Sequence, residues 1–257
     1  MSAQSQRMCL WAGLAMMPLF LGGFLLAGFI PPPAPGTPAA ELAAMFAQHR
    51  IEIRIGMFLA TVGSALLCFL FAAIASQLRR IEGGSSPLVY VQLVAGACAV
   101  LEFIFPLFIW QTAVYRGERA AVTVQLLNDL AWLPFLGITS TFLIQQVVIA
   151  LVILRDRADQ GELPRWLAYL NLWTAVGICP GSFVVFVHDG PLSWNGLLAW
   201  WVLLVSFFIW LVATGGCMLT ATRRWAAAPV APSTAQLARE LAELRAQLEA
   251  TVPRTTA

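Results

Sequence analysis

The residue of this sequence best placed to do chemistry inside a membrane is a carboxylate, Glu102, in an otherwise apolar run. Residues 88–110 contain no other charged side chain, and Glu102 comes fourteen residues after Leu88, about 20 Å along a helix. At that depth of a membrane, a carboxyl group must be protonated, paired with a base or exposed to a water-filled cavity. Glu102 is therefore the first candidate for ligand binding or proton transfer.

Two arginines are the expected partners of Glu102. Arg50 and Arg54 are one helical turn apart before the second apolar run, so their guanidinium groups share one helix face. Either side chain can lay its stem along apolar surface and reach into the membrane, and we expect an ion pair between Glu102 and Arg54. Two alternatives stay open: an ion pair with only a structural role, and a protonated acid that faces lipid.

Further polar residues gather on the same side of the expected membrane. Asp129 and Asn128 open the fourth apolar run, and His188 lies with Asp189 in the fifth connection. For the last two, plain turn formation before Gly190 is the favoured interpretation, with a functional role as the alternative. No HxxxH or ExxH spacing is present, so we predict no metal site. A GxSxG motif and a P-loop are also missing from the sequence, which therefore does not indicate nucleophilic catalysis or nucleotide hydrolysis.

Helix-breaking residues at this depth predict a pocket that opens to the outer side. A proline removes a backbone hydrogen bond, which a membrane tolerates where protein or a cavity satisfies the freed carbonyl. The breaks are Pro106, Pro134, Gly137, Gly177, Pro180 and Gly181, and a polar stripe follows Pro134, Gly137, Thr141 and Gln145. Small and polar residues at this spacing are also typical of helices that pack closely, so that interpretation stays open.

The elements that must position these residues are six apolar runs. With 60% apolar and 11% charged residues, a chain of 257 residues has too little polar surface to cover a globule in water. A bilayer core requires about 20 apolar residues per helix, which six runs supply. The runs are 8–30, 55–76, 88–110, 130–154, 166–187 and 197–219. We predict an all-α integral membrane protein, with a six-helix transmembrane bundle in 1–225 and a linker and short cytoplasmic helix in 226–257.

The distribution of arginines predicts which way the bundle faces. One side carries eight arginines before the tail, whereas the other carries only Arg50, Arg54, Arg116 and Arg119. Because positively charged loops stay in the cytoplasm, we expect both termini there. A net charge of +2, with basic residues set between apolar runs, excludes nucleic acid as a partner. All fifteen basic residues are arginine, which excludes Schiff-base chemistry at a lysine.

The connections and the tail carry further signals. The first connection is expected to be stiff over 30–38 and helical over 39–50, resting on the membrane surface or covering the pocket. Aromatic anchors at the outer lipid interface are predicted at Trp110, Trp132, Trp194, Trp200 and Trp201. In the tail, a capping box at Ser233 and Gln236 precedes a two-heptad seam of Leu237, Leu241, Leu244 and Leu248. We favour a homo-oligomer through this helix, with docking to a partner or to its own bundle as alternatives.

The layout of six short-looped spans, with the segment GPLSWNG at 190–196, resembles small six-helix membrane proteins of bacteria. The resemblance implies a location in the bacterial cytoplasmic membrane. It covers topology rather than individual residues, so it assigns no site residue and no function.

Our leading hypothesis is a protein that binds or moves a lipophilic small molecule or lipid through the outward-facing pocket. An alternative is a membrane enzyme in which Glu102 or Asp129 acts as general acid or base on a lipid-soluble substrate. A structural or assembly subunit is a further alternative. The sequence identifies no cofactor and no catalytic residue. The predicted ligand-binding residues are Glu102, Arg50, Arg54, Asp129, Trp132, Gly137, Thr141, Pro180 and His188.

Overall fold

The computed structural model describes residues 2–84, 86–157, 161–227, 239, 241–244 and 247, and their regular structure is entirely helical. Six helical segments are long and apolar enough to cross a membrane. They are Ala3–Leu26, Arg50–Ile81, Pro87–Tyr115, Ala121–Arg155, Arg165–Phe186 and Leu197–Ala227. The predicted number of helices of spanning length is therefore confirmed.

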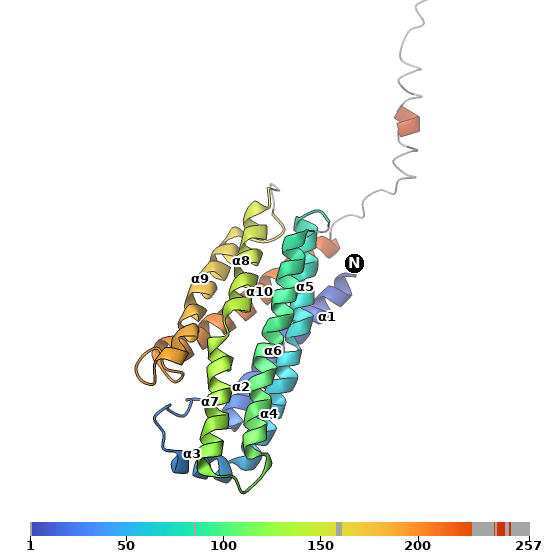
Figure 1. Ribbon diagram of the computed structural model, residues 1–257. Coiled ribbons are helices and arrows are strands. Elements are labelled where there is room, and N and C mark those ends of the chain that lie inside the picture. Colours follow the sequence, from blue (N-terminus) through green and yellow to red (C-terminus); the bar gives the residue numbers. More distant parts are fainter. Residues whose placement is uncertain are drawn as a thin grey trace, which may run out of the picture. The chain divides into compact units, whose positions relative to one another are not determined.

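Most of these segments combine two shorter helical elements (Figure 1). The first joins α1 (Ala3–Leu14) to α2 (Met16–Leu26), and the second joins α4 (Arg50–Ala65) to α5 (Leu67–Ile81). The fourth joins α7 (Ala121–Gly137) to α8 (Ser140–Arg155). The fifth continues from α9 (Arg165–Ile178) into the 3₁₀ helix η1 (Cys179–Phe186), and the sixth begins as the π-helix η2 (Leu197–Val202) before α10 (Leu203–Ala227).

The second and fourth segments are longer than predicted, at 32 and 35 residues. Helix α4 begins at Arg50 rather than near residue 55, and α7 begins at Ala121 rather than near residue 130. Asn128 and Asp129 therefore lie inside α7, and the prediction that they open the fourth span is wrong. Hydropathy marks only the apolar part of a helix, whereas backbone hydrogen bonding continues through polar residues that are good helix formers.

Helix α6 (Pro87–Tyr115) lies in the middle of the bundle and packs against α4, α5, α7 and α8. Ser86 caps its start by accepting a hydrogen bond from the Leu88 amide at 3.3 Å, and Pro87 occupies the first turn, where no amide hydrogen is needed. The helix continues through Pro106. The predicted break at Pro106 is therefore wrong, since loss of one backbone hydrogen bond does not end a helix that its neighbours hold on several sides.

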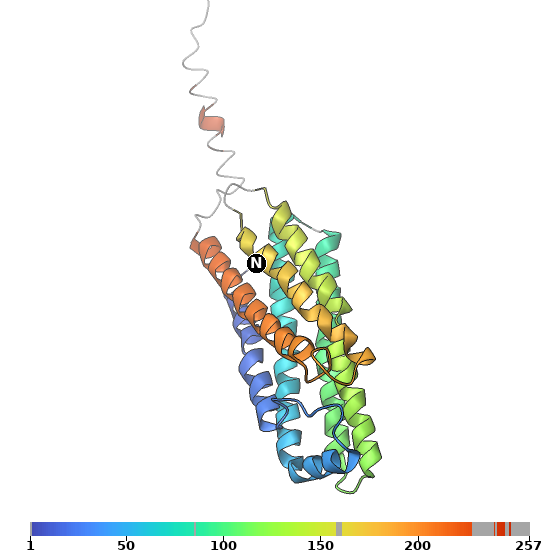
Figure 2. The same cartoon turned by 90° about the vertical axis from the view of Figure 1, so that its left-hand side faces the viewer.

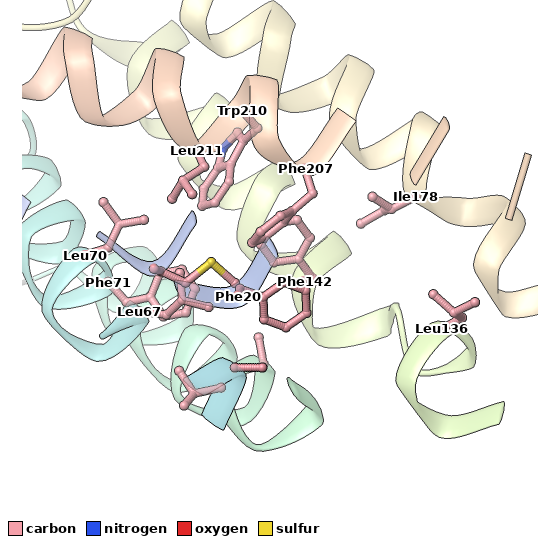
Figure 3. Close-up of a cluster of buried hydrophobic side chains, with 14 of the residues drawn as sticks. Phe20, Leu67, Leu70, Phe71, Leu136, Phe142, Ile178, Phe207, Trp210 and Leu211 are labelled. Carbon is pink, nitrogen blue, oxygen red and sulfur yellow. The ribbon is translucent and has the colours of Figure 1, made fainter. Parts of the chain in front are cut away.

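Close helix contacts depend on residues without side chains. A Cβ atom on Gly23 of α2 would overlap the carbonyl oxygen of Gly56 on α4, and the reverse also holds. Larger residues at either position would force α2 and α4 apart, as expected for small residues where helices cross. Figure 2 shows α10 running obliquely across the bundle, and Figure 3 shows its side chains Phe207 and Trp210 facing Phe142 of α8. Their ring centroids are 5.6 and 5.0 Å from that of Phe142.

The first connection contains the helix that the sequence predicts. Helix α3 (Ala39–Gln48) buries Leu42 and Phe46 and packs against α4, α6 and α7. Ahead of it, the Pro33 carbonyl accepts a hydrogen bond from the Trp194 indole at 2.7 Å. The first and fifth connections are thus joined at one end of the bundle.

The chain divides into two compact units, Met1–Arg223 and Arg224–Ala257. In the second unit, Arg239, residues 241–244 and Gln247 are helical, and Leu241 and Leu244 are exposed. Ser233, Gln236, Leu237 and Leu248 lie outside the described residues. The two-heptad seam, the homo-oligomer and the domain boundary at 225 stay predictions.

Candidate functional site

A cleft inside the first unit contains Glu102. The space free of protein atoms between its walls, with the solvent at its opening included, is about 620 Å³. Its lining is aromatic and aliphatic apart from Glu102 and Thr139. Rings from α2, α6, α7, α8 and α10 form much of the wall, namely Phe20, Phe103, Phe135, Phe142, Phe207 and Phe208. We call this space the Glu102 cleft.

Irregular backbone shapes one side of the Glu102 cleft. Residues 138 and 139 interrupt the helix between α7 and α8, four positions after Pro134, and α9 changes to 3₁₀ geometry at Cys179, beside Pro180. Element η1 packs against both α7 and η2, so it lies between these two elements. Only part of the predicted set of helix breaks is found here: α7 continues through Pro134 and α9 through Gly177, whereas Gly137 and Pro180 lie at the irregular segments, at the margin of the cleft rather than in its lining.

The glycines of the fifth segment act in packing. A Cβ atom on Gly177 would lie 2.5 Å from the Ser206 hydroxyl oxygen of α10, and one on Gly181 would overlap the Leu136 carbonyl. By contrast, a Cβ on Gly137 would make only ordinary contact, 3.7 Å from Val184. The packing interpretation therefore holds for Gly177 and Gly181.

Two predicted site residues meet at the cleft. The Thr141 hydroxyl, in the first turn of α8, donates a hydrogen bond to Oε1 of Glu102. The second carboxyl oxygen, Oε2, makes no hydrogen bond to any residue that the structure describes. Nearby, the hydroxyl oxygens of Thr139 and Ser182 are 2.5 Å apart and share a hydrogen bond. The cleft thus offers one carboxyl oxygen in apolar surroundings, where a hydrogen bond or charge contact is strong.

Arg50 and Arg54 lie away from Glu102. The Arg50 guanidinium donates from Nε to the Val114 carbonyl at 2.8 Å and from Nη2 to the Tyr115 carbonyl at 2.7 Å. These carbonyls belong to residues twelve and thirteen positions after Glu102, about 18–20 Å along α6. Arg54 is exposed and makes no ion pair with Glu102 within the described ranges. The predicted pair is wrong: Arg50 lies level with residues 114 and 115, so Arg54, one turn farther into the bundle, is still about two turns of α6 from Glu102, beyond the reach of its side chain.

Asp129 and His188 come within electrostatic range of each other, although neither lines the Glu102 cleft. His188 is exposed, and Asp129 is partly buried on α7. These two predicted site residues therefore lie near each other, at a place separate from the cleft.

Trp132 is fully buried and contributes to the cleft indirectly. Its ring centroid is 4.7 Å from that of Trp110 and 5.4 Å from that of Trp200, which lines the cleft. Trp110, Trp132 and Trp200 all lie in the interior, so their predicted role as anchors at the lipid interface is wrong. Edge-to-face contacts among the three rings stabilise them there, and the Trp110 indole also donates to the Asn128 side chain at 3.3 Å.

Sequence reasoning missed part of the polar interior. Gln92, Gln145 and Gln146 are fully buried, and no described residue bonds either end of their amides. The Gln145 amide lies against Gly96 of α6, where an added Cβ would be 2.5 Å from Nε2. Gln145 belongs to the predicted polar stripe, one turn beyond Thr141. The sequence could have pointed to Gln92 and Gln146 as well, because any polar side chain in an apolar run, charged or not, indicates a buried polar contact or a cavity.

Within the described residues, no three His, Cys, Asp or Glu side chains converge as metal ligands would. No protein-family model, curated protein or solved structure matches the chain. Fold and cleft together define a class: an all-helical protein with six helices of membrane-spanning length and an apolar cleft holding one carboxyl group.

Proposed function

We propose that this chain is a multi-pass membrane protein that binds or moves a lipophilic small molecule or lipid through the Glu102 cleft. Large apolar side chains point outward from the long helices, with Phe105 65%, Val94 64% and Trp173 73% exposed. Apolar surface of this extent is unfavourable in water and is the surface that acyl chains cover. A lipid environment would also deliver lipophilic ligands to the cleft.

We further propose a bacterial cytoplasmic membrane with both termini inside. The eight-to-four division of arginines supports this orientation, and the six-span layout supports the location. The end that carries α3 and the 116–120 connection would then face outward, so that the cleft is reached from the outer side.

One observation carries the ligand proposal: a carboxyl group with an unused oxygen in a cleft walled by phenylalanine rings. Its lining resembles that of small-molecule sites, which consist mostly of apolar and aromatic side chains with a few polar groups. Its ligand would have an apolar body and one hydrogen-bond donor directed at Oε2 of Glu102.

Glu102→Gln tests this proposal. Glutamine keeps the size of the side chain and its bond from Thr141 but loses the carboxylate. Hydrogen bonds to charged groups contribute about 1.5–3 kcal/mol, so a fluorescent long-chain alkylamine should bind about tenfold more weakly or worse. Native mass spectrometry should also find less lipophilic ligand retained from the membrane. Glu118→Gln is the control, because Glu118 is exposed and lines no part of the cleft. Equal affinity and retention in Glu102→Gln and the wild type would exclude the proposal.

The same variant separates the two other hypotheses. A membrane enzyme would lose turnover of a lipid-soluble substrate in Glu102→Gln while still binding it. An assembly subunit would lose only thermal stability in Glu102→Leu and would show no saturable lipophile binding in the wild type.

A further inference from the structure

A second cavity lies at the far end of α6, about 20 Å along that helix from Glu102. The space free of protein atoms between its walls, with the solvent at its opening included, is about 420 Å³. Arg50 of α4 and Arg116 and Arg119 of the connection to α7 line it, and most of the remaining wall is apolar, including Phe46 of α3 and Val124 of α7. We call this cavity the arginine pocket.

The charges of the arginine pocket are unbalanced. None of its lining residues is acidic, and Glu118, between two of the arginines in sequence, is exposed and does not line it. The one salt bridge found among the described residues joins Arg80 to Glu162, far from this connection in sequence. Three guanidinium groups around one space repel one another until an anion enters.

Hydrogen-bond donors in the pocket are also unused. The Arg119 Nε atom is buried and has no partner among the described residues. Arg50 donates from Nε and Nη2 to carbonyls at the end of α6, and these two bonds fix the plane of its guanidinium group. Its remaining nitrogen, Nη1, faces Gly117, where an added Cβ would be only 3.1 Å away. A buried donor without a partner is costly, so an acceptor in the pocket would be stabilising.

From this geometry we propose that the arginine pocket binds a phosphate group. Guanidinium groups present planar pairs of donors that match the oxygens of a phosphate, and a fixed guanidinium loses little freedom on binding. The apolar wall at Phe46 and Val124 suits the glycerol and first acyl carbons of an anionic lipid. Free phosphate has the same oxyanion chemistry without an apolar part. This end of the bundle has only four arginines, and three of them line the pocket. A bound anion would account for their position there.

Thermal unfolding of the full chain in a neutral detergent tests the proposal, with phosphatidylglycerol added in one arm and inorganic phosphate in the other. The double variant Arg116→Gln/Arg119→Gln removes two guanidinium groups and leaves the Arg50 bonds to α6 intact. Arg54→Gln is the matched control, because Arg54 has the same charge at the same end and lines neither cavity. Arg116→Gln alone, at an exposed position, gives a second test should the double variant unfold.

We expect phosphatidylglycerol to raise the Tm of the wild type and of Arg54→Gln, and to bind the double variant at least about tenfold more weakly. A Tm increase with lipid alone identifies the headgroup as the source, whereas an equal increase with inorganic phosphate identifies the free anion. Either result supports the pocket. Equal responses of the wild type and the arginine variants in both arms would overturn it. The alkylamine affinity of the Glu102 cleft should stay unchanged in these variants, so the two proposals fail separately.

Discussion

The Glu102 cleft and the arginine pocket both border α6, but they use charge in opposite ways. The cleft surrounds one carboxyl group with phenylalanine rings deep in the bundle, and a single Thr141 hydroxyl contacts that group. The pocket places three arginines at a helix end, where one of them already bonds two backbone carbonyls. Depth explains the difference. A charge deep in the bundle is costly, so only one is found among the described residues of the cleft, whereas water near a helix end weakens the repulsion among several like charges without removing it.

Filling the cleft should have the largest effect and should leave the pocket untouched. Leu204 lines the cleft from α10, so Leu204→Trp should abolish detectable alkylamine binding by occupying the space. Val205→Trp is the control, because Val205 is its neighbour on α10 and is 53% exposed. Both variants should keep the wild-type Tm increase with phosphatidylglycerol. Normal alkylamine affinity in Leu204→Trp would show that the ligand binds elsewhere.

Arg50→Gln should change the stability of the protein more than it changes the alkylamine affinity of the Glu102 cleft. The variant loses two charge-assisted hydrogen bonds to the last carbonyls of α6, which should lower the free energy of unfolding by about 2 kcal/mol. Unfolding in detergent measures this change, and Arg54→Gln should change it by less than about 0.5 kcal/mol. If Arg50→Gln is as stable as the wild type, the arginine does not hold the end of α6.

Thr141→Val should have the smallest effect of the three and is confined to the cleft. Valine keeps the shape of threonine but cannot donate to Glu102, so the carboxyl group is no longer held toward the cleft. Because Thr141 acts on the ligand only through the orientation of the carboxyl group, we expect an effect of about 1 kcal/mol, which corresponds to an alkylamine affinity about fivefold lower. Thr141→Ser should restore the affinity because it restores the hydroxyl. A Ser variant as weak as the Val variant would assign Thr141 to packing alone.

Much of the architecture could be predicted from the sequence. The six long apolar helices follow from run lengths, and α3 follows from good helix formers after a proline-rich stretch. That Glu102 and Thr141 both line the interior could be predicted, because each is a polar residue in an apolar helix and so must face protein or a cavity. Pro134 lies three residues before the end of α7, and Pro180 lies at the start of the 3₁₀ helix η1, so both prolines are close to changes in helix geometry near the cleft.

The errors have a common physical origin: hydropathy gives the apolar extent of a helix and not its length or rotation. Arg54 was expected to reach Glu102 by extending its side chain along the bundle, but about two turns of α6 separate their heights. Trp110 and Trp132 satisfy an interfacial pattern as well as an interior one, and only the packing of neighbouring helices decides between them. The arginine pocket joins residues from α3, α4, α6 and α7, and no local pattern contains all of them.

The π-helix η2 sets the angular position of every side chain that follows it in the sixth segment. Leu203, Leu204 and Phe207 face the cleft, while Val205 and Ile209 point outward. A π-helix contains about one residue more per turn than an α-helix, so loss of one codon from 197–202 would convert this turn to α geometry and keep these faces in place. Loss of one codon from the start of α10 itself would instead rotate the residues that follow by about 100° against the cleft. Length changes within α10 should therefore be rarer among functional descendants of the gene than a one-residue deletion in 197–202.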